Sequence, residues 1–540
     1  MTIINLTDNI TADHQLIMSA LNAVTWLSTE QSSGRFPADR YLEEIEDIAQ
    51  LAVTRGWHGL KQCIFGSPAF APVHRLSREL LNIIFLLCHP ESSSGRWSQG
   101  EFVRPSPRTV PLVLTHVCKA WREVAISIPE LWSSIDVHLS NKVPRSVALR
   151  SVDFVDTWLR RSGNLPLSLS ITVNEYPYDA IPVLALYFSY VPRWQHIRCQ
   201  IESDKILRDS PPFIVHPGVA ASLETLEVST RGIISENLSI PFNRIMTVAP
   251  RLRQCSFTRL APYYALAHRS ISLPISQLTH LCLEDFESVE HCLEVLRDSR
   301  KLIDCRLNLG RLFECSTGIQ KHSVVRLDEL RSLQICTRSG LPDFLDHLIL
   351  PALRDITIHF ERNSSRYKSD TAWPQSQFTS LICRSSCSLT KLHFKSVPLS
   401  EKNLLQCLRH TTLSLRELHI EDKNPLTCVT DVVLKRLSHG SSGRGRHASL
   451  CPRLDTFRFS RCGSFTMDAF TNMLESRMSN ANRSPSPLRC VRPRIVEVAM
   501  ITWADRLEVL RILRAAIEDS CNSIVTWRTS AVRPQKSHSR

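Results

Sequence analysis

Residues 351–360 read PALRDITIHF and contain the pattern that decides the fold. Leu353, Ile356 and Ile358 occupy the first, fourth and sixth places of a short apolar triplet. Successive side chains of a strand point to opposite faces, so Ile356 and Ile358 share one face and Thr357 lies on the other. The pattern therefore predicts a short strand with one apolar face and one polar face.

The same triplet recurs in order from residue 194 onward, and most intervals between copies run from 23 to 29 residues. Inward-pointing residues of such strands stack on those of the next copy and build a continuous core. A strand and a helix at a period in the twenties are typical of leucine-rich repeats. The triplets begin at Trp194, Leu223, Leu252, Leu278, Leu302, Leu330, Leu353, Leu389, Leu415 and Leu454.

Helical patterns fill several of the intervals, at 289–296, 344–348, 404–408, 433–437 and 470–474. Arg or a small residue often follows the first apolar residue of the triplet, with Pro just before it in several copies. No regular Asn or Cys follows the strand, so the repeat is degenerate. We expect an α+β or α/β solenoid, in which a small helical module is followed by a degenerate leucine-rich-repeat horseshoe.

The composition is that of a globular chain of more than one domain, with 540 residues, 43% hydrophobic and 22% charged. Its longest apolar run, residues 80–88, is too short to span a bilayer, so we expect no membrane contact. The 18 cysteines include no C-x-x-C pair, which argues against a zinc site. Reduced, buried thiols of a cytoplasmic or nuclear protein are the simpler interpretation.

The net charge of +13 is dispersed, without a long Lys/Arg run or an aromatic-basic ladder, and this argues against nucleic acid as the partner. No phosphate-binding loop, dinucleotide fingerprint, H-E-x-x-H or G-x-S-x-G motif occurs, and only 16 glycines are present. We therefore expect no enzyme activity, no cofactor and no metal.

Two helical patterns precede the repeats. Leu76, Leu80, Ile83, Ile84 and Leu87 mark the first. The second contains Val113, Val117, Ala120, Trp121 and Val124; Pro129 ends it, and Leu131 and Trp132 follow. Two short helices cannot bury such faces by themselves, so the pattern predicts a partner that receives them in a groove.

This region, residues 72–132, resembles the F-box-like proteins common in mushroom-forming fungi. That family shows Leu-Pro-x-Glu-Leu, Ile-Phe, Val-Cys-x-x-Trp and a closing Leu-Trp. Ser77 stands where the family usually has Pro, and residues 158–171 also resemble what often follows in the family. The matching residues are Leu76, Glu79, Leu80, Ile84, Phe85, Val117, Cys118, Trp121, Arg122, Leu131 and Trp132.

The resemblance implies binding to the Skp1 subunit of an SCF-type ubiquitin ligase, and to the cullin through it. Trp132 is expected in the core, and core packing is the alternative role for each contact candidate. The implied Skp1-binding residues are Leu76, Leu80, Ile84, Phe85, Val117, Cys118 and Trp121.

The expected organisation has five parts. They are an N-terminal helical segment (1–71), an F-box-like domain (72–138), a connecting segment (139–193), the repeats (194–520) and a disordered basic tail (521–540). The Ser-, Gly- and Pro-rich segments 91–110, 438–449 and 479–489 are expected to be loops. Ser484 and Ser486 precede prolines and are candidate phosphorylation sites, although such dipeptides are common in loops.

The residues between the inward places of each strand are expected on the concave face, where solenoids bind ligands. Their charge points to an acidic or phosphorylated protein target, and solvated strand residues are the alternative. The target-binding candidates are Arg306, Gln334, His359, His393, Lys395, His419 and Arg458.

Taken together, the sequence predicts a substrate-recognition adaptor that holds Skp1 by one module and an unknown protein target by the repeats. A repeat scaffold without a ligase role is the first alternative. A nucleic-acid-binding repeat protein is the second.

Overall fold

The structure is a computed structural model, and it describes only part of the chain. The described residues are 76–88, 102–140, 145–174, 180–202, 220–232, 236–260, 273–284, 286, 289–309, 324–361, 372–421, 428–438, 450–462, 465–480 and 495–500. The expected N-terminal helices, Ser484, Ser486 and the basic tail lie outside these ranges. The chain divides into two compact units, Met1–Leu252 and Arg253–Arg540, which are described separately below.

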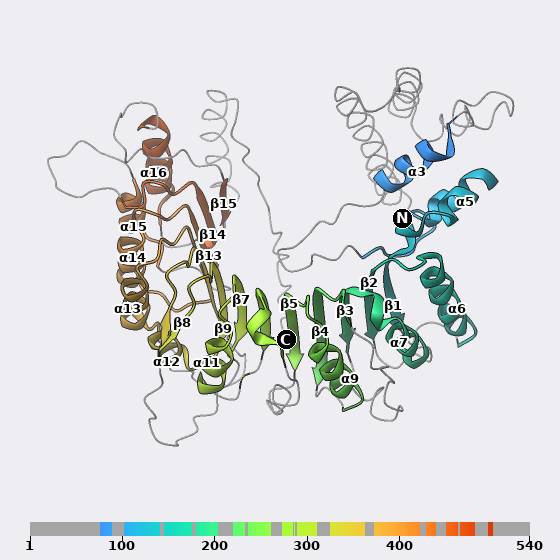
Figure 1. The fold of residues 1–540 in the computed structure, drawn as a ribbon. Coiled ribbons are helices and arrows are strands. Elements are labelled where there is room, and N and C mark those ends of the chain that lie inside the picture. The colour runs from blue at the N-terminus through green and yellow to red at the C-terminus, as the bar shows by residue number, and fades with distance from the viewer. Residues whose placement is uncertain are drawn as a thin grey trace, which may run out of the picture. The chain divides into compact units, whose positions relative to one another are not determined.

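The first unit opens with short helices and continues with alternating strands and helices (Figure 1). Strands β1 to β4 are parallel and pair in chain order, so Ile135 lies beside Leu169 and Leu169 beside Ile197. Its elements are α3 (Arg78–Leu87), α4 (Leu112–Thr115), α5 (Lys119–Ile126), η2 (Pro129–Trp132), β1 (Ser134–Ser140), α6 (Arg145–Arg161), β2 (Leu167–Asn174), α7 (Ala180–Ser189), η3 (Val191–Arg193), β3 (Trp194–Ile201), β4 (Thr225–Gly232) and α9 (Glu236–Thr247).

The second unit repeats the same alternation. Its main strands are parallel and again neighbour one another in chain order, β5-β6-β7-β9-β11-β12-β13-β14-β15, and β8 pairs with β10. The elements are β5 (Gln254–Leu260), η4 (Ile275–Gln277), β6 (His280–Glu284), α11 (Val289–Arg297), β7 (Asp304–Asn308), β8 (Val325–Arg326), β9 (Ser332–Thr337), α12 (Leu341–Asp346), β10 (Leu348–Ile349), β11 (Asp355–Phe360), α13 (Gln375–Ser385), β12 (Lys391–Lys395), α14 (Glu401–His410), β13 (Glu417–Glu421), α15 (Asp431–Leu437), β14 (Thr456–Cys462), α16 (Met467–Asn480) and β15 (Ile495–Met500).

The apolar triplets form the core. Every member of the ten triplets is buried, and none exposes more than 3% of its surface. In β11, for example, Ile356 and Ile358 are fully buried and stack beside Leu333 and Ile335 of β9. Each such side chain contributes roughly 1.5–3 kcal/mol by leaving water, so the triplets are the main source of stability.

The helices of the second unit cover the apolar face of its sheet (Figure 1). Consecutive helices contact one another, as in the pairs α12–α13, α13–α14 and α15–α16. The predicted helical patterns are confirmed, because α11, α14, α15 and α16 bury the apolar positions expected from sequence. The α/β class with a parallel sheet is therefore confirmed.

The strand alternation begins earlier than residue 194. Trp132, Ile135 and Val137 occupy the first, fourth and sixth places of a triplet that opens β1, and all three are buried. Trp132 also donates its indole N–H to the Ala125 carbonyl at 2.8 Å and lies 4.8 Å from the Trp158 ring. The residue that closes the helical module is therefore the first core residue of the sheet.

Arginines tie the end of one helix to the next. Arg384 of α13 donates to the carbonyl of Leu345 near the end of α12 at 2.8 Å, and to that of Leu348, which opens β10, at 3.1 Å. Arg477 of α16 is completely buried and donates to the carbonyl of Leu437 at the end of α15. The bonds to Leu345 and Leu437 satisfy carbonyls that a helix end leaves without intrahelical partners.

No helix among the described ranges is long and apolar enough to cross a membrane.

Candidate interaction surfaces

Helix α3 owes its start to Ser77. The Ser77 hydroxyl accepts the Leu80 backbone N–H at 3.3 Å, which is the standard N-cap contact. Leu81 and Phe85, four residues apart, form the buried stripe of the helix. The residue that departs from the family pattern thus has a local role, because it satisfies one N–H of the first turn.

Helix α5 is capped in a similar way by Cys118, whose Sγ accepts the Trp121 N–H at 3.5 Å. Arg122 donates to the Thr115 carbonyl at 2.7 Å and so joins α5 to the end of α4. Arg78 of α3 donates to the Ser127 hydroxyl at 2.8 Å, just beyond α5. The three helices therefore form one small module.

Two aromatic rings connect α3 with α5. The rings of Phe85 and Trp121 lie 4.9 Å apart. Phe85 is fully buried, so a direct contact between its side chain and a partner would require the module to rearrange. The prediction that Phe85 contacts a partner is therefore corrected, because its ring packs within the module. Trp121 stays half-buried and presents part of its indole to the surface.

The other predicted contact residues lie at the surface of the module. Leu76, Leu80, Ile84, Val117 and Cys118 are all half-buried. Part of each side chain packs in the module and part is exposed, so each could serve the core, a partner contact or both. Cys118 acts as a helix cap, which the sequence did not predict.

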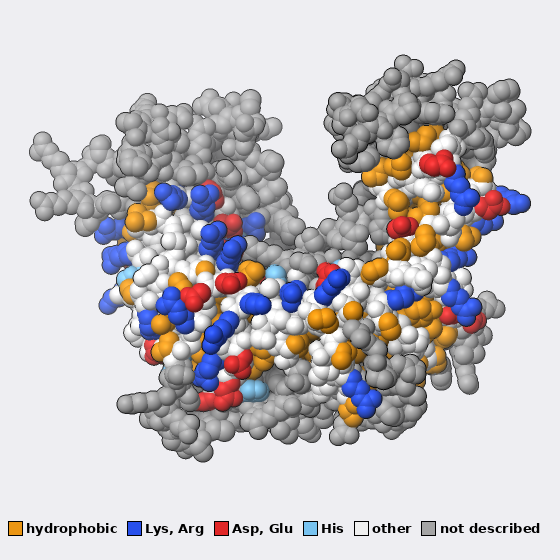
Figure 2. Space-filling view, viewed as in Figure 1, with side chains coloured by type: hydrophobic (Ala, Val, Ile, Leu, Met, Phe, Trp, Pro, Cys, Tyr) orange, Lys and Arg blue, Asp and Glu red, His pale blue; other side chains and the backbone are white. Residues whose placement is uncertain are grey.

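Sequence reasoning found only one of the three most exposed apolar side chains of this module. Leu86, Leu87 and Ile126 expose 39%, 37% and 37% of their surface. Leu87 belongs to the apolar face that the sequence predicted to need a partner, whereas Leu86 and Ile126 were part of neither predicted face. Figure 2 shows hydrophobic side chains gathered over this part of the first unit. We name Leu80, Ile84, Leu87, Trp121 and Ile126 the apolar helical surface.

A second surface is the polar face of the second unit's sheet, made of the strand residues that alternate with the buried triplets. The register places Arg306 beside Gln334, and Thr357 between Gln334 and His393. His393 lies beside His419, and His419 beside Arg458. Five predicted target residues therefore form one row across the sheet. The remaining two, His359 and Lys395, pair in the neighbouring row.

His419 differs from what the sequence predicted, because it is only 4% exposed. Burial, together with Lys391, His393 and Arg458, lowers the pKa of His419 to about 3. Its ring is therefore neutral at pH 7 and packs edge-on against His393, with ring centroids 5.3 Å apart. The prediction that His419 offers positive charge to a target is therefore corrected.

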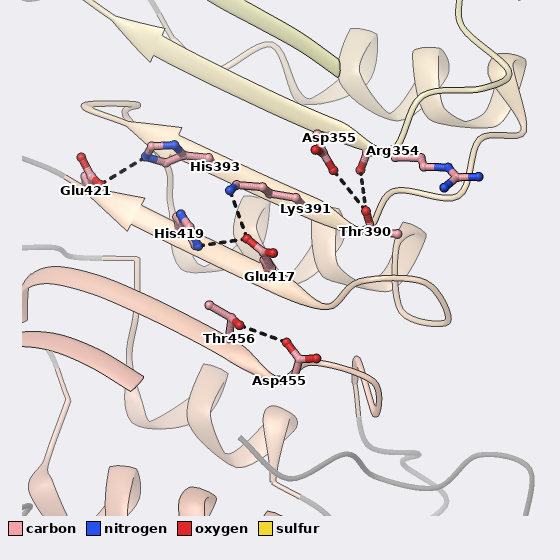
Figure 3. Close-up of polar contacts among 10 residues, drawn as sticks. All are labelled: Arg354, Asp355, Thr390, Lys391, His393, Glu417, His419, Glu421, Asp455 and Thr456. Carbon is pink, nitrogen blue, oxygen red and sulfur yellow. Dashed lines mark hydrogen bonds and ion pairs between the residues drawn. The ribbon is translucent and has the colours of Figure 1, made fainter. Parts of the chain in front are cut away.

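The charged residues of β12 and β13 face one another across the strands (Figure 3). Lys391 Nζ lies 3.0 Å from Glu417 Oε2, and His393 Nε2 lies 3.4 Å from Glu421 Oε1. The contact with His393, assisted by Lys395, lowers the pKa of Glu421. Charges on this face are therefore largely matched by a neighbour.

The polar face carries no excess of positive charge among the residues whose side chains are described. Basic and acidic residues occur there in nearly equal number. The basic residues are Arg306, Lys391, Lys395 and Arg458, and the acidic ones are Glu284, Asp304, Asp355, Glu417 and Glu421. This differs from the expected positive character, because Asp304, Asp355 and Glu417 stand directly before the second apolar residue of their triplets and add negative charge to the face.

One cluster on this face brings a thiol next to an imidazole. Cys336 Sγ lies 3.2 Å from His359 Nδ1 and 3.3 Å from Glu361 Oε1. Glu361 also accepts from Arg338 at 2.8 Å and from Asn308 at 3.4 Å. Burial and the negative charge of Glu361 raise the pKa of Cys336, so the thiol is protonated and donates to the carboxylate. The arrangement does not favour a thiolate nucleophile.

Within the described ranges, no group of three or more His, Cys, Asp or Glu side chains is arranged to hold a metal ion. Most described cysteines are buried free thiols, and Cys383 is exposed. The two surfaces are suited to contacts with other molecules. The first unit has the apolar helical surface, and the second has a polar face whose charges are largely matched by neighbours.

Comparison with known proteins adds no family or name to this geometry. No family model matches the chain, and a search of curated proteins also finds no match.

Proposed function

We propose that the chain is a substrate-recognition adaptor of an SCF-type ubiquitin ligase. The module α3–α5 with η2 would bind a Skp1-like subunit, and the polar face of the second unit would bind a protein target. The role would be to bring two proteins together, which needs no catalytic residue of its own. We expect it to act in the cytosol or nucleus, where free thiols stay reduced.

The observation that carries the proposal is the apolar helical surface. Leu87 and Ile126 lie more than one third exposed on two helices that also carry half-buried Leu80, Ile84 and Trp121. Apolar side chains gathered on a surface mark contacts with other proteins. The resemblance of residues 72–132 to F-box-like proteins supplies the identity of the expected partner.

We also propose that the strands and helices are copies of a degenerate leucine-rich repeat. The regular triplets, the pairing of strands in chain order and the helix after most strands support this architecture. In such arrays the strand face without helices is a common ligand surface. This makes the polar face of the second unit the proposed target surface.

A pull-down of the full chain by a purified Skp1-like subunit tests the partner. We expect the wild-type chain to be captured. Leu87→Asp should abolish capture, because it places a charge in an apolar interface from which water is excluded. Trp121→Ala and Leu80→Asp should also abolish it.

Leu413→Asp is the matched control, because Leu413 is 62% exposed and lies in the second unit. Its capture should equal that of the wild type. A Leu87→Asp chain that is captured as well as the control would reject the docking surface. A wild-type chain that is not captured would favour the scaffold without a ligase role.

Charge reversal tests the target surface. Arg306→Glu, Lys395→Glu and Arg458→Glu together should abolish capture of the target, because they reverse three positive charges that the polar face offers to an acidic target. The comparison is with Arg297→Glu, Lys402→Glu and Arg409→Glu, which change exposed helix residues by the same charge. Undiminished capture by the first triple variant would reject the polar face as the target surface.

A further inference from the structure

Basic residues line the edge of the second unit at which its strands begin. Arg253, Arg331, Arg354 and Arg416 stand directly before β5, β9, β11 and β13. Three more basic residues lie in the turns that lead into these or neighbouring strands, and all seven side chains are exposed. We name the seven the basic edge: Arg253, Arg300, Lys301, Arg331, Arg354, Arg416 and Arg453.

Backbone hydrogen bonds fix the spacing of this edge. The Arg331 carbonyl accepts the N–H groups of Arg354 and Asp355, both at 2.9 Å. The Arg354 carbonyl accepts from Thr390 at 2.7 Å, and the Thr390 carbonyl accepts from Arg416 at 2.8 Å. Neighbouring strands lie about 4.8 Å apart, so Arg331 and Arg354 are adjacent and Arg416 follows two strands later.

The guanidinium groups at the centre of the edge are not neutralised. Among the described residues, the side chains of Arg331, Arg354 and Arg416 make no ion pair and no hydrogen bond. Figure 3 shows the guanidinium of Arg354 turned away from the contact between Thr390 and Asp355. The polar face is different, since Lys391 is held there by Glu417. Like charges on adjacent strands repel, and an anionic ligand would relieve this repulsion.

Arginine is the side chain best suited to carboxylates, because its fork of N–H groups binds both oxygens at once. Six of the seven residues of the basic edge are Arg. Exposed acidic side chains, Asp298 and Glu329, interrupt the edge. They would repel a closely spaced phosphate backbone, whereas a peptide can place its carboxylates between them.

We propose that the basic edge binds an extended, glutamate- or aspartate-rich segment of a partner protein. Arg331 and Arg416 are three strand steps apart, which is about 14 Å. An extended peptide covers this length with about four residues, and carboxylates on alternate residues repeat every ~6.6 Å. The proposal concerns a surface outside the polar face and does not depend on the adaptor role.

Fluorescence anisotropy with the full chain tests the proposal. The ligand is a labelled twelve-residue peptide of alternating Glu and Ser, in 50 mM salt. We expect saturable binding that weakens in 300 mM salt, and no binding of the Gln-Ser peptide of the same length. The triple variant Arg331→Gln, Arg354→Gln and Arg416→Gln should bind the Glu-Ser peptide about tenfold more weakly, because each exposed ion pair contributes modestly.

The matched control is Arg297→Gln, Lys402→Gln and Arg409→Gln, which removes the same charge from exposed positions on α11 and α14. It should bind the Glu-Ser peptide like the wild type. An equal loss in this control would show that only net charge matters and would overturn the proposal. A twelve-nucleotide single- or double-stranded DNA that binds more tightly than the peptide would overturn it too, in favour of a nucleic-acid surface. Absence of binding by the Glu-Ser peptide would also overturn the proposal.

Discussion

Replacing Arg477 with Met should destabilise the end of the second unit more than any surface change. Arg477 is completely buried, and its guanidinium donates to the carbonyls of Leu437, Leu454, Leu450 and Cys451 at 2.9, 2.9, 3.3 and 2.7 Å. These carbonyls come from the end of α15 and from residues 450–454, which lead into β14. One side chain of α16 therefore holds two segments, and all four acceptors lie more than 20 residues from it in the sequence.

The magnitude follows from the four bonds. Met fills a similar volume, so the loss is mainly that of the hydrogen bonds. Each buried carbonyl left without its donor costs about 1 kcal/mol, and the sum is about 4 kcal/mol. Cys451 adds to the effect, because its φ of 51° lies in the left-handed region and the turn needs external support.

Urea unfolding of the full chain measures the effect. With a slope of about 2–3 kcal/mol per molar urea, the midpoint should fall by about 1–2 M. Arrays of repeats can unfold in parts, so hydrogen exchange of residues 450–459 should report the same loss locally. Arg409→Met, at an exposed place on α14, is the control and should leave the midpoint unchanged. A loss below about 1 kcal/mol for Arg477→Met would refute the reasoning.

Two further predictions concern titration and thiol chemistry. The pKa of His419 is about 3 in the folded chain, below the 6.5 of a free side chain, so the unfolded chain binds the extra proton between these values. The free energy of unfolding should therefore have its full value above pH 6.5 and fall by roughly 1 kcal/mol per pH unit as the pH drops below 6. His419→Phe should flatten this slope in urea unfolding at several pH values; an unchanged slope would mean that other groups cause it. For the thiols, peptide mapping after iodoacetamide at pH 7 should find the exposed Cys383 labelled at least about tenfold faster than Cys336, whose raised pKa keeps it protonated. Equal labelling would show that Cys336 is accessible as a thiolate.

The sequence predicted the strands of the second unit well because their signal is local. A triplet such as Leu353, Ile356 and Ile358 fixes which side chains share a face, and burial of that face follows from period two. β1 and β2 were missed for a local reason as well. Pro166 stands at the first place before Leu169 and Ile171, and Trp132 was read as the end of the helical module.

The site could be predicted only in part, because charge matching depends on register between strands. The sequence shows Lys391 and Glu417 far apart, and only the pairing of β12 with β13 places them 3.0 Å apart. Burial of His419 has the same origin, since its neighbours come from other strands. The basic edge did have a local signal, the Arg that follows the first apolar residue of several triplets, but exposure and spacing were needed to recognise a surface.

The carbonyl before each strand has a consequence for how such a chain can change in length. At each step it accepts two N–H groups from the equivalent place of the next repeat, as Arg331 does from Arg354 and Asp355. Removing residues 355–390 would join Arg354 directly to Lys391. Arg416 and Glu417 would then stand one repeat after Arg354, where Thr390 and Lys391 stood, and their two N–H groups would meet the Arg354 carbonyl. Whole repeats are thus interchangeable parts, and gain or loss of one entire repeat during evolution should preserve the sheet where a cut within a repeat would not.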